Sequence, residues 1–269
     1  MSPRDPRLPS DRVRQRRRLV IAGSLSLVLI AVAVLVVGYV TGIEPADGSS
    51  SAADDEVTPT PRPAPNSLPA PASVDTFDRG ARSIDDPMSI WVVVNKLRPV
   101  NPQEFEPADL VEVPVEYTNE PELRQEASAA VVAMFDAAFA EAGLELASNS
   151  AYRSYSAQEN VYDGDDATTA RPGFSEHQTG LAIDIGPLSG ECSLDPCLAD
   201  MPEGIWLRDN AWRFGFILRY PADKTPITGY SFEPWHFRYV GTELATEMHD
   251  TGVTTLEEFF GLPPAPEYG

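Results

Sequence analysis

An uncharged run of 22 residues, Leu19 to Val40, is the strongest constraint on how this chain can fold. At a rise of about 1.5 Å per residue, a helix of that length crosses the hydrocarbon core of a bilayer, which is about 30 Å thick. A helix buried in a globular core shows a polar face, whereas this run is apolar on all sides apart from Ser24 and Ser26. We therefore predict a transmembrane helix over residues 19–40.

The charges that flank this run predict its orientation. Residues 1–18 carry seven arginines, and the residues that follow the run are acidic. Because basic flanks stay in the cytoplasm, we expect a cytoplasmic tail over residues 1–18 and export of the remainder. A cleaved signal peptide has a shorter apolar region, of roughly 7–15 residues, so an uncleaved single-pass anchor is favoured, and the sequence alone leaves cleavage open.

The next segment has the composition of a linker. Residues 41–84 are rich in proline, alanine and serine and hold almost no large apolar side chain. Such a segment cannot bury enough apolar surface to fold, and its prolines keep it extended. We predict a disordered linker over residues 41–84, followed by one folded domain over residues 85–269, in which no internal repeat is found.

Helical spacing of apolar residues predicts one long helix over Glu122–Ala142, with Asn119 as its N-cap and Gly143 at its end. Shorter helices are predicted over Trp206–Phe214, over Thr242–Met248 and after a capping box formed by Thr254 and Glu257.

Alternating or β-branched runs predict strands. They lie at Leu144–Ser148, Leu181–Ile185, Phe216–Tyr220 and His236–Val240, while Ile90–Leu97 predicts a strand or an extended arm. Helices and strands alternate without a regular βαβ period, which favours the α+β class.

The net charge of −21 narrows the range of partners. A surface this acidic offers no broad basic patch for phosphates, so we expect no nucleic acid partner.

Two of the three histidines lie near acidic residues in patterns that suit a metal ion. His177 is followed by Asp184, with Gly180 between them to allow a tight turn, and His236 lies further along the chain. Two imidazoles and one carboxylate suit catalytic zinc, which takes three protein ligands and keeps a fourth position open. Each histidine alone is better explained as a core or surface residue, but their joint pattern favours a metal.

Glu233 lies three residues before His236 and is a candidate general base. On a regular strand these two side chains would point to opposite faces. Pro234 must therefore bend the chain if both are to face one metal ion.

These residues form the pattern S-x-H-x-x-G-x-x-x-D followed by E-x-x-H. Its fixed positions are Ser175, His177, Gly180, Asp184, Glu233 and His236. The chain thereby resembles the LAS zinc peptidases of the D-alanyl-D-alanine carboxypeptidase type. It is most similar to the VanY branch, peptidase family M15B, over roughly residues 90–260. Further blocks such as SAYRSYSAQ, GFILRYP and ITGYSFEPWHFRYVG also look like that branch and follow in its order.

The resemblance implies a small antiparallel sheet with flanking helices, the LAS or hedgehog-like fold. It implies Zn²⁺ held by His177, Asp184 and His236, with Glu233 as the catalytic base.

The resemblance also implies that Arg153 binds the free carboxylate of the peptide, for which a planar bidentate donor is suited, with Gln158 and Ser175 in the same subsite. From the residues alone, Arg153 could equally stack on its neighbouring tyrosines at the surface. Trp235 could line the cleft or pack in the core.

The implied activity is removal of the C-terminal D-Ala from peptidoglycan stem peptides in a bacterial envelope, by an enzyme anchored in the cell membrane. An L,D-carboxypeptidase acting on tetrapeptide stems shares every one of these motifs and stays open. So does a non-catalytic wall-binding module with the same fold, although the presence of Glu233 and of the complete ligand set speaks against it.

Cys192 and Cys197 are the only cysteines. On the exported side of a membrane we expect them to form a disulfide that pins an exposed loop near the site.

Overall fold

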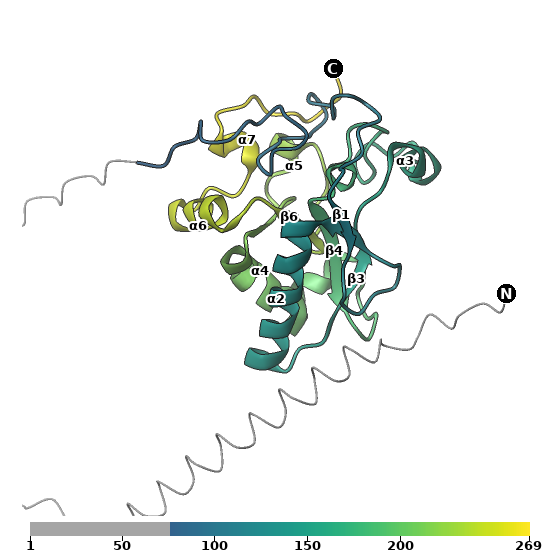
Figure 1. Ribbon diagram of the computed structural model, residues 1–269, viewed down its shortest axis with the longest axis vertical. Helices are drawn as coiled ribbons and strands as arrows, with labels where there is room; N and C mark the ends of the chain where they lie inside the picture. The colour runs from purple at the N-terminus through teal and green to yellow at the C-terminus, as the bar shows by residue number, and fades with distance from the viewer. Residues whose placement is uncertain (1–75) are drawn as a thin grey trace, which may run out of the picture. The chain divides into compact units, whose positions relative to one another are not determined.

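Four short strands form the antiparallel sheet on which the domain is built (Figure 1). The computed structural model describes residues 76–269. The strands lie in the order β3, β4, β6, β5 and comprise Leu146–Ser150, Ala182–Pro187, His236–Tyr239 and Phe216–Leu218. The α+β class and the small antiparallel sheet are confirmed.

A two-stranded sheet and a set of mostly short helices surround this sheet. The small sheet pairs β1 (Leu110–Glu112) with β2 (Glu122–Arg124). The α-helices are α2 (Gln125–Ala142), α3 (Tyr155–Val161), α4 (Pro202–Asn210), α5 (Thr225–Thr228), α6 (Thr242–Thr251) and α7 (Leu256–Phe259). Three 3-10 turns are η1 (Glu176–Thr179), η2 (Pro196–Asp200) and η3 (Ala211–Phe214).

The two faces of β4 have different partners. Ile183 and Ile185 are fully buried, and α4 packs against this strand. Burying each of these side chains stabilises the fold by roughly 1.5–3 kcal/mol. Asp184 lies between them and therefore points to the opposite face. A slip of one residue would bury the carboxylate among apolar groups, so the apolar face fixes the register of the strand that carries Asp184.

The long helix begins later than its apolar spacing predicts. Residues Glu122–Arg124 pair with β1, so α2 starts at Gln125, and the predicted start at Glu122 is wrong. Asn119 does not cap the helix, because its side-chain amide donates to the carbonyl of Asn149, 2.9 Å away. Gly143 ends α2 in the left-handed conformation, as predicted.

The predicted capping box is wrong by one residue. The side chain of Thr255 accepts the backbone N–H of Glu258 at 3.2 Å and donates to the Glu258 carboxylate at 2.8 Å. Thr254 and Glu257 therefore do not cap α7. Glu257 points into the core instead, where it is fully buried.

The remaining elements differ from prediction mainly at their ends. The helix predicted from Trp206 begins at Pro202 and finishes as the 3-10 turn η3, and the helix predicted to end at Met248 continues to Thr251. Strand β3 starts at Leu146 and not at the predicted Leu144, and β5 ends at Leu218 and not at the predicted Tyr220.

Residues 90–97 form an extended arm, because no strand of the described residues pairs with them. Their one β-bridge is local and joins Asn95 to Arg98. The arm is held by side-chain donors: Trp91 Nε1 donates to the carbonyl of Val240 at 3.0 Å, and Arg238 donates to the carbonyl of Val92 at 2.6 Å. Of the two readings of this run, the structure shows the arm.

The folded unit includes residues before position 85. Arg79 Nε donates to the carbonyl of Phe259 at 3.1 Å, and the Arg79 guanidinium lies 4.6 Å from the centre of the Phe259 ring. The predicted tail, the predicted transmembrane helix and most of the predicted linker lie outside the described residues. Within residues 76–269, no helix is both long and apolar enough to cross a membrane.

A buried cluster of four charged side chains joins the sheet to the last helix. Arg219 donates to Glu176 at 2.9 Å and to both carboxylate oxygens of Glu257, at 2.9 and 2.7 Å. Arg238 donates to Glu176 at 2.8 Å. All four side chains are fully buried. Two positive and two negative charges balance, so the cluster is buried with no net charge.

We predict that Glu257→Gln destabilises the fold by about 3 kcal/mol, because it leaves a buried guanidinium short of one negative charge. Attraction by Arg219 outweighs burial and holds the pKa of Glu257 below its ordinary value. This stabilisation is therefore fully present above about pH 4.3 and is lost as the pH falls through the folded-state pKa. Urea unfolding of the full-length protein in mild detergent, followed by tryptophan fluorescence, measures the difference, which should shrink in acid.

Glu258→Gln is the matched control on the same helix. Glu258 pairs with Lys224 at the surface, and exposed pairs contribute less than about 1 kcal/mol. Equal destabilisation by the two substitutions would contradict the special role of the buried cluster.

Candidate active site

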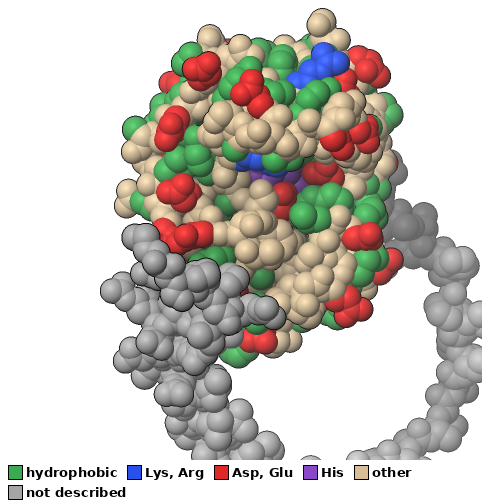
Figure 2. All heavy atoms as spheres, turned by 90° about the vertical axis from the view of Figure 1, so that its right-hand side faces the viewer, with side chains coloured by type: hydrophobic (Ala, Val, Ile, Leu, Met, Phe, Trp, Pro, Cys, Tyr) green, Lys and Arg blue, Asp and Glu red, His purple; other side chains and the backbone are tan. Residues whose placement is uncertain are grey.

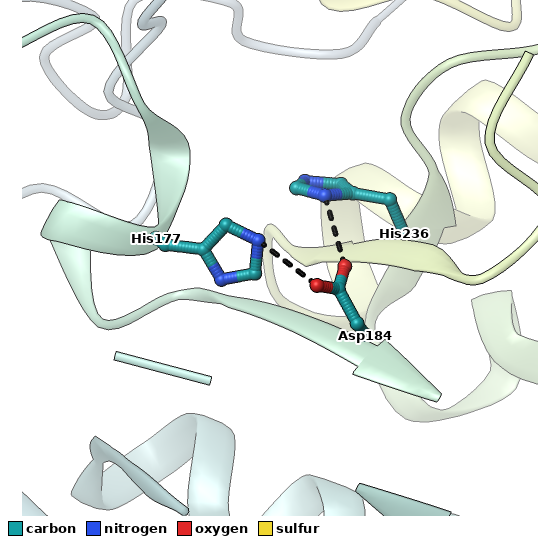
Figure 3. Close-up of side chains that lie close together, drawn as sticks. All are labelled: His177, Asp184 and His236. Carbon is teal, nitrogen blue, oxygen red and sulfur yellow. Dashed lines mark ion pairs between the residues drawn. The ribbon is translucent and has the colours of Figure 1, made fainter. Parts of the chain in front are cut away.

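Three predicted metal ligands converge from three segments of the chain (Figure 3). Asp184 on β4 and His236 on β6 are direct partners in the sheet, and His177 comes from η1. Asp184 Oδ2 lies 3.4 Å from His177 Nε2, and Asp184 Oδ1 lies 3.2 Å from His236 Nδ1. The side chains point toward one another, and all three are buried.

Gly180 turns the chain from η1 into β4. Its φ of 66° is left-handed, and its N–H donates to the carbonyl of His177 at 3.2 Å. A Cβ at this position would lie 2.9 Å from the side chain of Leu110. Only glycine satisfies both conditions without strain, so the predicted tight turn is present.

The ring of His177 is held so that one nitrogen faces Asp184. Its Nδ1 lies 2.7 Å from the carbonyl oxygen of Ala151, which can only accept a hydrogen bond. Nδ1 therefore carries the proton, and the lone pair of Nε2 points toward Asp184. Burial lowers the pKa of His177, which keeps the ring neutral and able to bind a metal.

An ion-pair contact orients His236, and the sequence analysis missed the residue that makes it, Glu176. Its Oε2 lies 3.5 Å from His236 Nε2. Burial would raise the pKa of Glu176, but attraction by Arg219 and Arg238 outweighs it and holds the pKa well below its ordinary value. The negative charge of this carboxylate favours a proton on the nearby Nε2 of His236, which leaves Nδ1 to face the site.

The three side chains fit a zinc ion. One ligand atom from each lies within 4.8 Å of the others, and Asp184 Oδ1 is buried with no hydrogen-bond partner in the described part of the chain. Burial disfavours a proton on His236, yet contacts with Asp184 and Glu176 raise the pKa of His236 to about 9. Without a bound cation, this pKa places a proton on Nδ1 of His236, and a metal ion would take the place of that proton. Two imidazoles with one carboxylate are a zinc donor set.

Glu233 reaches the same point from the turn before β6. The N–H of His236 donates to the carbonyl of Glu233 at 3.1 Å, which closes a turn through Pro234. The carboxylate oxygen Oε2 of Glu233 thereby comes within 3.6 Å of His236 Nδ1, as the predicted bend requires. Burial raises the pKa of Glu233 to about 7, which suits a group that accepts and returns a proton near neutral pH.

Arg153 brings a positive charge to this largely acidic group. Its backbone N–H donates to the carbonyl of His177 at 3.2 Å, and its buried Nε has no hydrogen-bond partner among the described residues. Burial lowers the pKa of Arg153, but an arginine in proteins stays charged. A buried donor with no partner in the protein is available for a ligand.

All eight predicted site residues line one cavity of about 190 Å³. They are Arg153, Gln158, Ser175, His177, Asp184, Glu233, Trp235 and His236. Figure 2 shows this hollow, with histidine and a basic side chain lying beneath a rim of acidic and apolar groups. Of the two readings of Trp235, its place in the cavity wall favours the cleft. Gln158 donates to the carbonyl of Ala170 at 2.7 Å, while its Oε1 is buried without a partner.

We predict that Glu176→Gln weakens Zn²⁺ binding by about tenfold, because supporting contacts to metal ligands contribute on that scale. In one orientation, the new amide NH2 group would face the N–H of His236. In the other orientation, it would face the two arginines and lose the hydrogen bonds that they donate. Competition with a chromophoric chelator, at a temperature where all variants are folded, measures the affinity.

Glu257→Gln is the control for this measurement, because it removes an acid from the same cluster without contacting His236. It should leave Zn²⁺ affinity nearly unchanged. Equal weakening by both substitutions would assign the effect to the cluster as a whole and not to the contact with His236.

Known proteins are similar to this chain in sequence and in fold. The VanY family profile, described as D-alanyl-D-alanine carboxypeptidase, matches residues 120–242. The putative carboxypeptidase YodJ of Bacillus subtilis (strain 168) is 42% identical over 195 residues, which cover 67% of this chain and 70% of YodJ.

Two solved structures are similar as well. One is the LdcB LD-carboxypeptidase, with a TM-score of 0.61 and 42% identity over 65% of this chain and 87% of the other. The second is a mutant of the vancomycin-resistance D,D-pentapeptidase VanY in complex with Zn(II), with a TM-score of 0.54 and 35% identity over 64% of this chain and 98% of the other. The extent of these matches places the chain in the VanY family of D-alanyl-D-alanine carboxypeptidases.

Proposed function

We propose that this protein is a zinc-dependent D-alanyl-D-alanine carboxypeptidase that removes the C-terminal D-Ala from peptidoglycan stem peptides. The observation that carries the proposal is the pairing, in one cavity, of a metal ligand set with the buried Nε of Arg153, which has no hydrogen-bond partner within residues 76–269. A metal site alone indicates hydrolysis, whereas a fixed cation beside it selects a chain end that bears a free carboxylate.

Arg153 defines which peptide bond is cleaved. Its guanidinium can bind a carboxylate with two parallel hydrogen bonds, and the low polarity of its surroundings strengthens this charge pairing. Because Arg153 is adjacent to His177 through a backbone hydrogen bond, a peptide anchored there places its last peptide bond over the ligand set. The enzyme then removes one C-terminal residue at a time.

Glu233 handles the proton of the reaction. Zinc, when bound, polarises the scissile carbonyl and makes a water molecule more acidic. Glu233, with a pKa near neutrality, takes one proton from that water as its oxygen attacks the carbonyl carbon. It then gives the proton to the leaving amine as the C–N bond breaks, so the products are a shortened peptide and free D-Ala.

The similarity to LdcB favours one alternative within the same chemistry. LdcB is described as an LD-carboxypeptidase, and the ligands, base and arginine serve either stereochemistry equally. The two activities differ in the configuration of the residue before the scissile bond. Substrate preference, and not the catalytic groups, therefore separates them.

We further propose that the enzyme works outside a bacterial cell membrane, held by a single N-terminal helix over residues 19–40. The length of the uncharged run and the arginines before it support this arrangement. The acidic composition of the rest of the chain agrees with work in the cell wall.

In intact cells, an external protease should remove a tag at the C-terminus and spare a tag at the N-terminus. The physical reason is that arginines flanking the helix keep the N-terminus inside. Immunoblots of both tags, before and after lysis, give the result. Equal protection of the two tags would contradict the proposed topology.

Full-length enzyme in mild detergent should release D-Ala from a muramyl pentapeptide that ends in D-Ala-D-Ala. A chelator should abolish the reaction and added Zn²⁺ should restore it, while Glu233→Gln should reduce kcat by at least about 100-fold, because general base catalysis contributes on that scale. Release from the tetrapeptide alone would assign the L,D activity. No release from either peptide by zinc-loaded protein would leave a wall-binding module.

The same D-Ala release assay tests the role of Arg153 when the C-terminus of the substrate is changed. Replacing the terminal carboxylate of the pentapeptide by an amide should slow the wild type to the level of Arg153→Ala, and that variant should treat acid and amide alike. A variant that still prefers the acid would place the carboxylate elsewhere.

A further inference from the structure

The loop that follows β4 forms part of the wall of the catalytic cavity. Cys192 and Cys197 form a disulfide within it, and Leu194, between them, lines the cavity. Leu194 is 50% exposed, although a leucine gains free energy when it is buried. The proposed mechanism gives this residue no role.

Gly186 allows the loop to lie directly on the sheet beside the metal ligands. Gly186 and Asp184 are two residues apart on β4 and so face the same side. A Cβ at position 186 would lie 2.6 Å from Ser193 Oγ and 2.7 Å from Asn149 Nδ2. Because residue 186 has no side chain, Ser193, the residue before Leu194, can pack directly against the strand.

The backbone of the loop is held in an uncommon conformation. Cys192 and Leu194 both have a φ of 55°, which side chains other than glycine rarely adopt. Such conformations persist only where the surroundings enforce them. Here the disulfide closes the loop, and Asp195 accepts the N–H of Cys197 at 2.9 Å. The exposed position of Leu194 is thus imposed by its surroundings.

The sheet register places this loop and Arg153 on opposite sides of Asp184. Ser150, at the end of β3, is the partner of Asp184, and the chain continues from there to Arg153, which bonds to the backbone of His177 ahead of β4. The loop packs on Gly186, beyond Asp184 in the other direction. Two residues of a strand span about 6–7 Å, which matches one to two residues of an extended peptide.

We propose that the disulfide loop is a specificity element, and that Leu194 contacts the aliphatic side chain of the second substrate residue on the N-terminal side of the scissile bond. This inference rests on the proposed function, because it takes Arg153 as the anchor of the terminal carboxylate. A peptide anchored there and cleaved at the ligand set must continue toward Leu194. An apolar residue held at that position binds the uncharged aliphatic part of a substrate and contributes nothing to an acetyl group in its place.

The test compares two substrates: a stem pentapeptide, and N-acetyl-D-Ala-D-Ala, which lacks the upstream residues. In the full-length enzyme, Leu194→Asn should raise KM for the pentapeptide roughly five- to tenfold, with kcat little changed, since uniform binding is lost. Asparagine tolerates the left-handed conformation, so the loop keeps its shape. KM for the acetylated dipeptide should not change, and Leu194→Met should restore the wild-type value.

Leu188→Asn is the matched control. Leu188 lies in the same loop and is 39% exposed, but it does not line the cavity. It should leave KM for both substrates unchanged. The double substitution of Cys192 and Cys197 by serine should raise KM for the pentapeptide as Leu194→Asn does. Combining the two changes should add little, because they remove the same contact.

A calorimetric measurement separates this inference from the proposed function. In the Glu233→Gln background, pentapeptide binding is measured without turnover, and Leu194→Asn should weaken it by the same factor as it raises KM. Weakening there supports the contact even if no D-Ala is released by the parent enzyme. An unchanged affinity and KM, or an equal change for the acetylated dipeptide, would overturn the role of Leu194.

Discussion

The buried cluster of Glu176, Arg219, Arg238 and Glu257 connects segments that are far apart in sequence. Each charge is fully buried, and removing a partner from such a pair is strongly destabilising, so the segments that carry these residues must assemble together. Glu176 uses one carboxylate oxygen for both arginines and turns the other toward His236. The orientation of a metal ligand therefore depends on contacts that extend to the last helix of the domain.

The cavity gives its two carboxylates different protonation behaviour. Burial would raise the pKa of Asp184, but its contacts with His177 and His236 outweigh burial and hold the pKa well below the ordinary value. Burial dominates at Glu233 and raises its pKa to about 7. One carboxylate is thereby a permanent anion suited to a cation, and the other can exchange a proton near neutral pH. The neighbours of each group, and not its residue type, decide this division of roles.

The sequence predicted the site better than it predicted the boundaries of the elements. His177 and Asp184 are separated by one glycine turn, and the E-x-x-H spacing of Glu233 is local, so short patterns carry both pairs. Glu176 was missed although it lies beside His177, because its role arises from Arg219, just after β5, and from Arg238 on β6. The same tertiary pairing explains the wrong capping box: Glu257 is held by Arg219, which leaves Glu258 as the residue that pairs with Thr255.

Strand β4 sets the direction of the cleft. Before Asp184, the chain from β3 brings Arg153 to His177, and after it Gly186 leaves room for the disulfide loop. A cation at one end and an apolar residue at the other make the two directions chemically different, so a peptide can bind in only one orientation with its carboxylate paired. Similar solved structures include both an LD-carboxypeptidase and a D,D-pentapeptidase, so the fold is compatible with either stereochemistry. The preference for a particular stem must therefore arise from the walls of the cleft, where a loop can change without disturbing the sheet that holds the ligands.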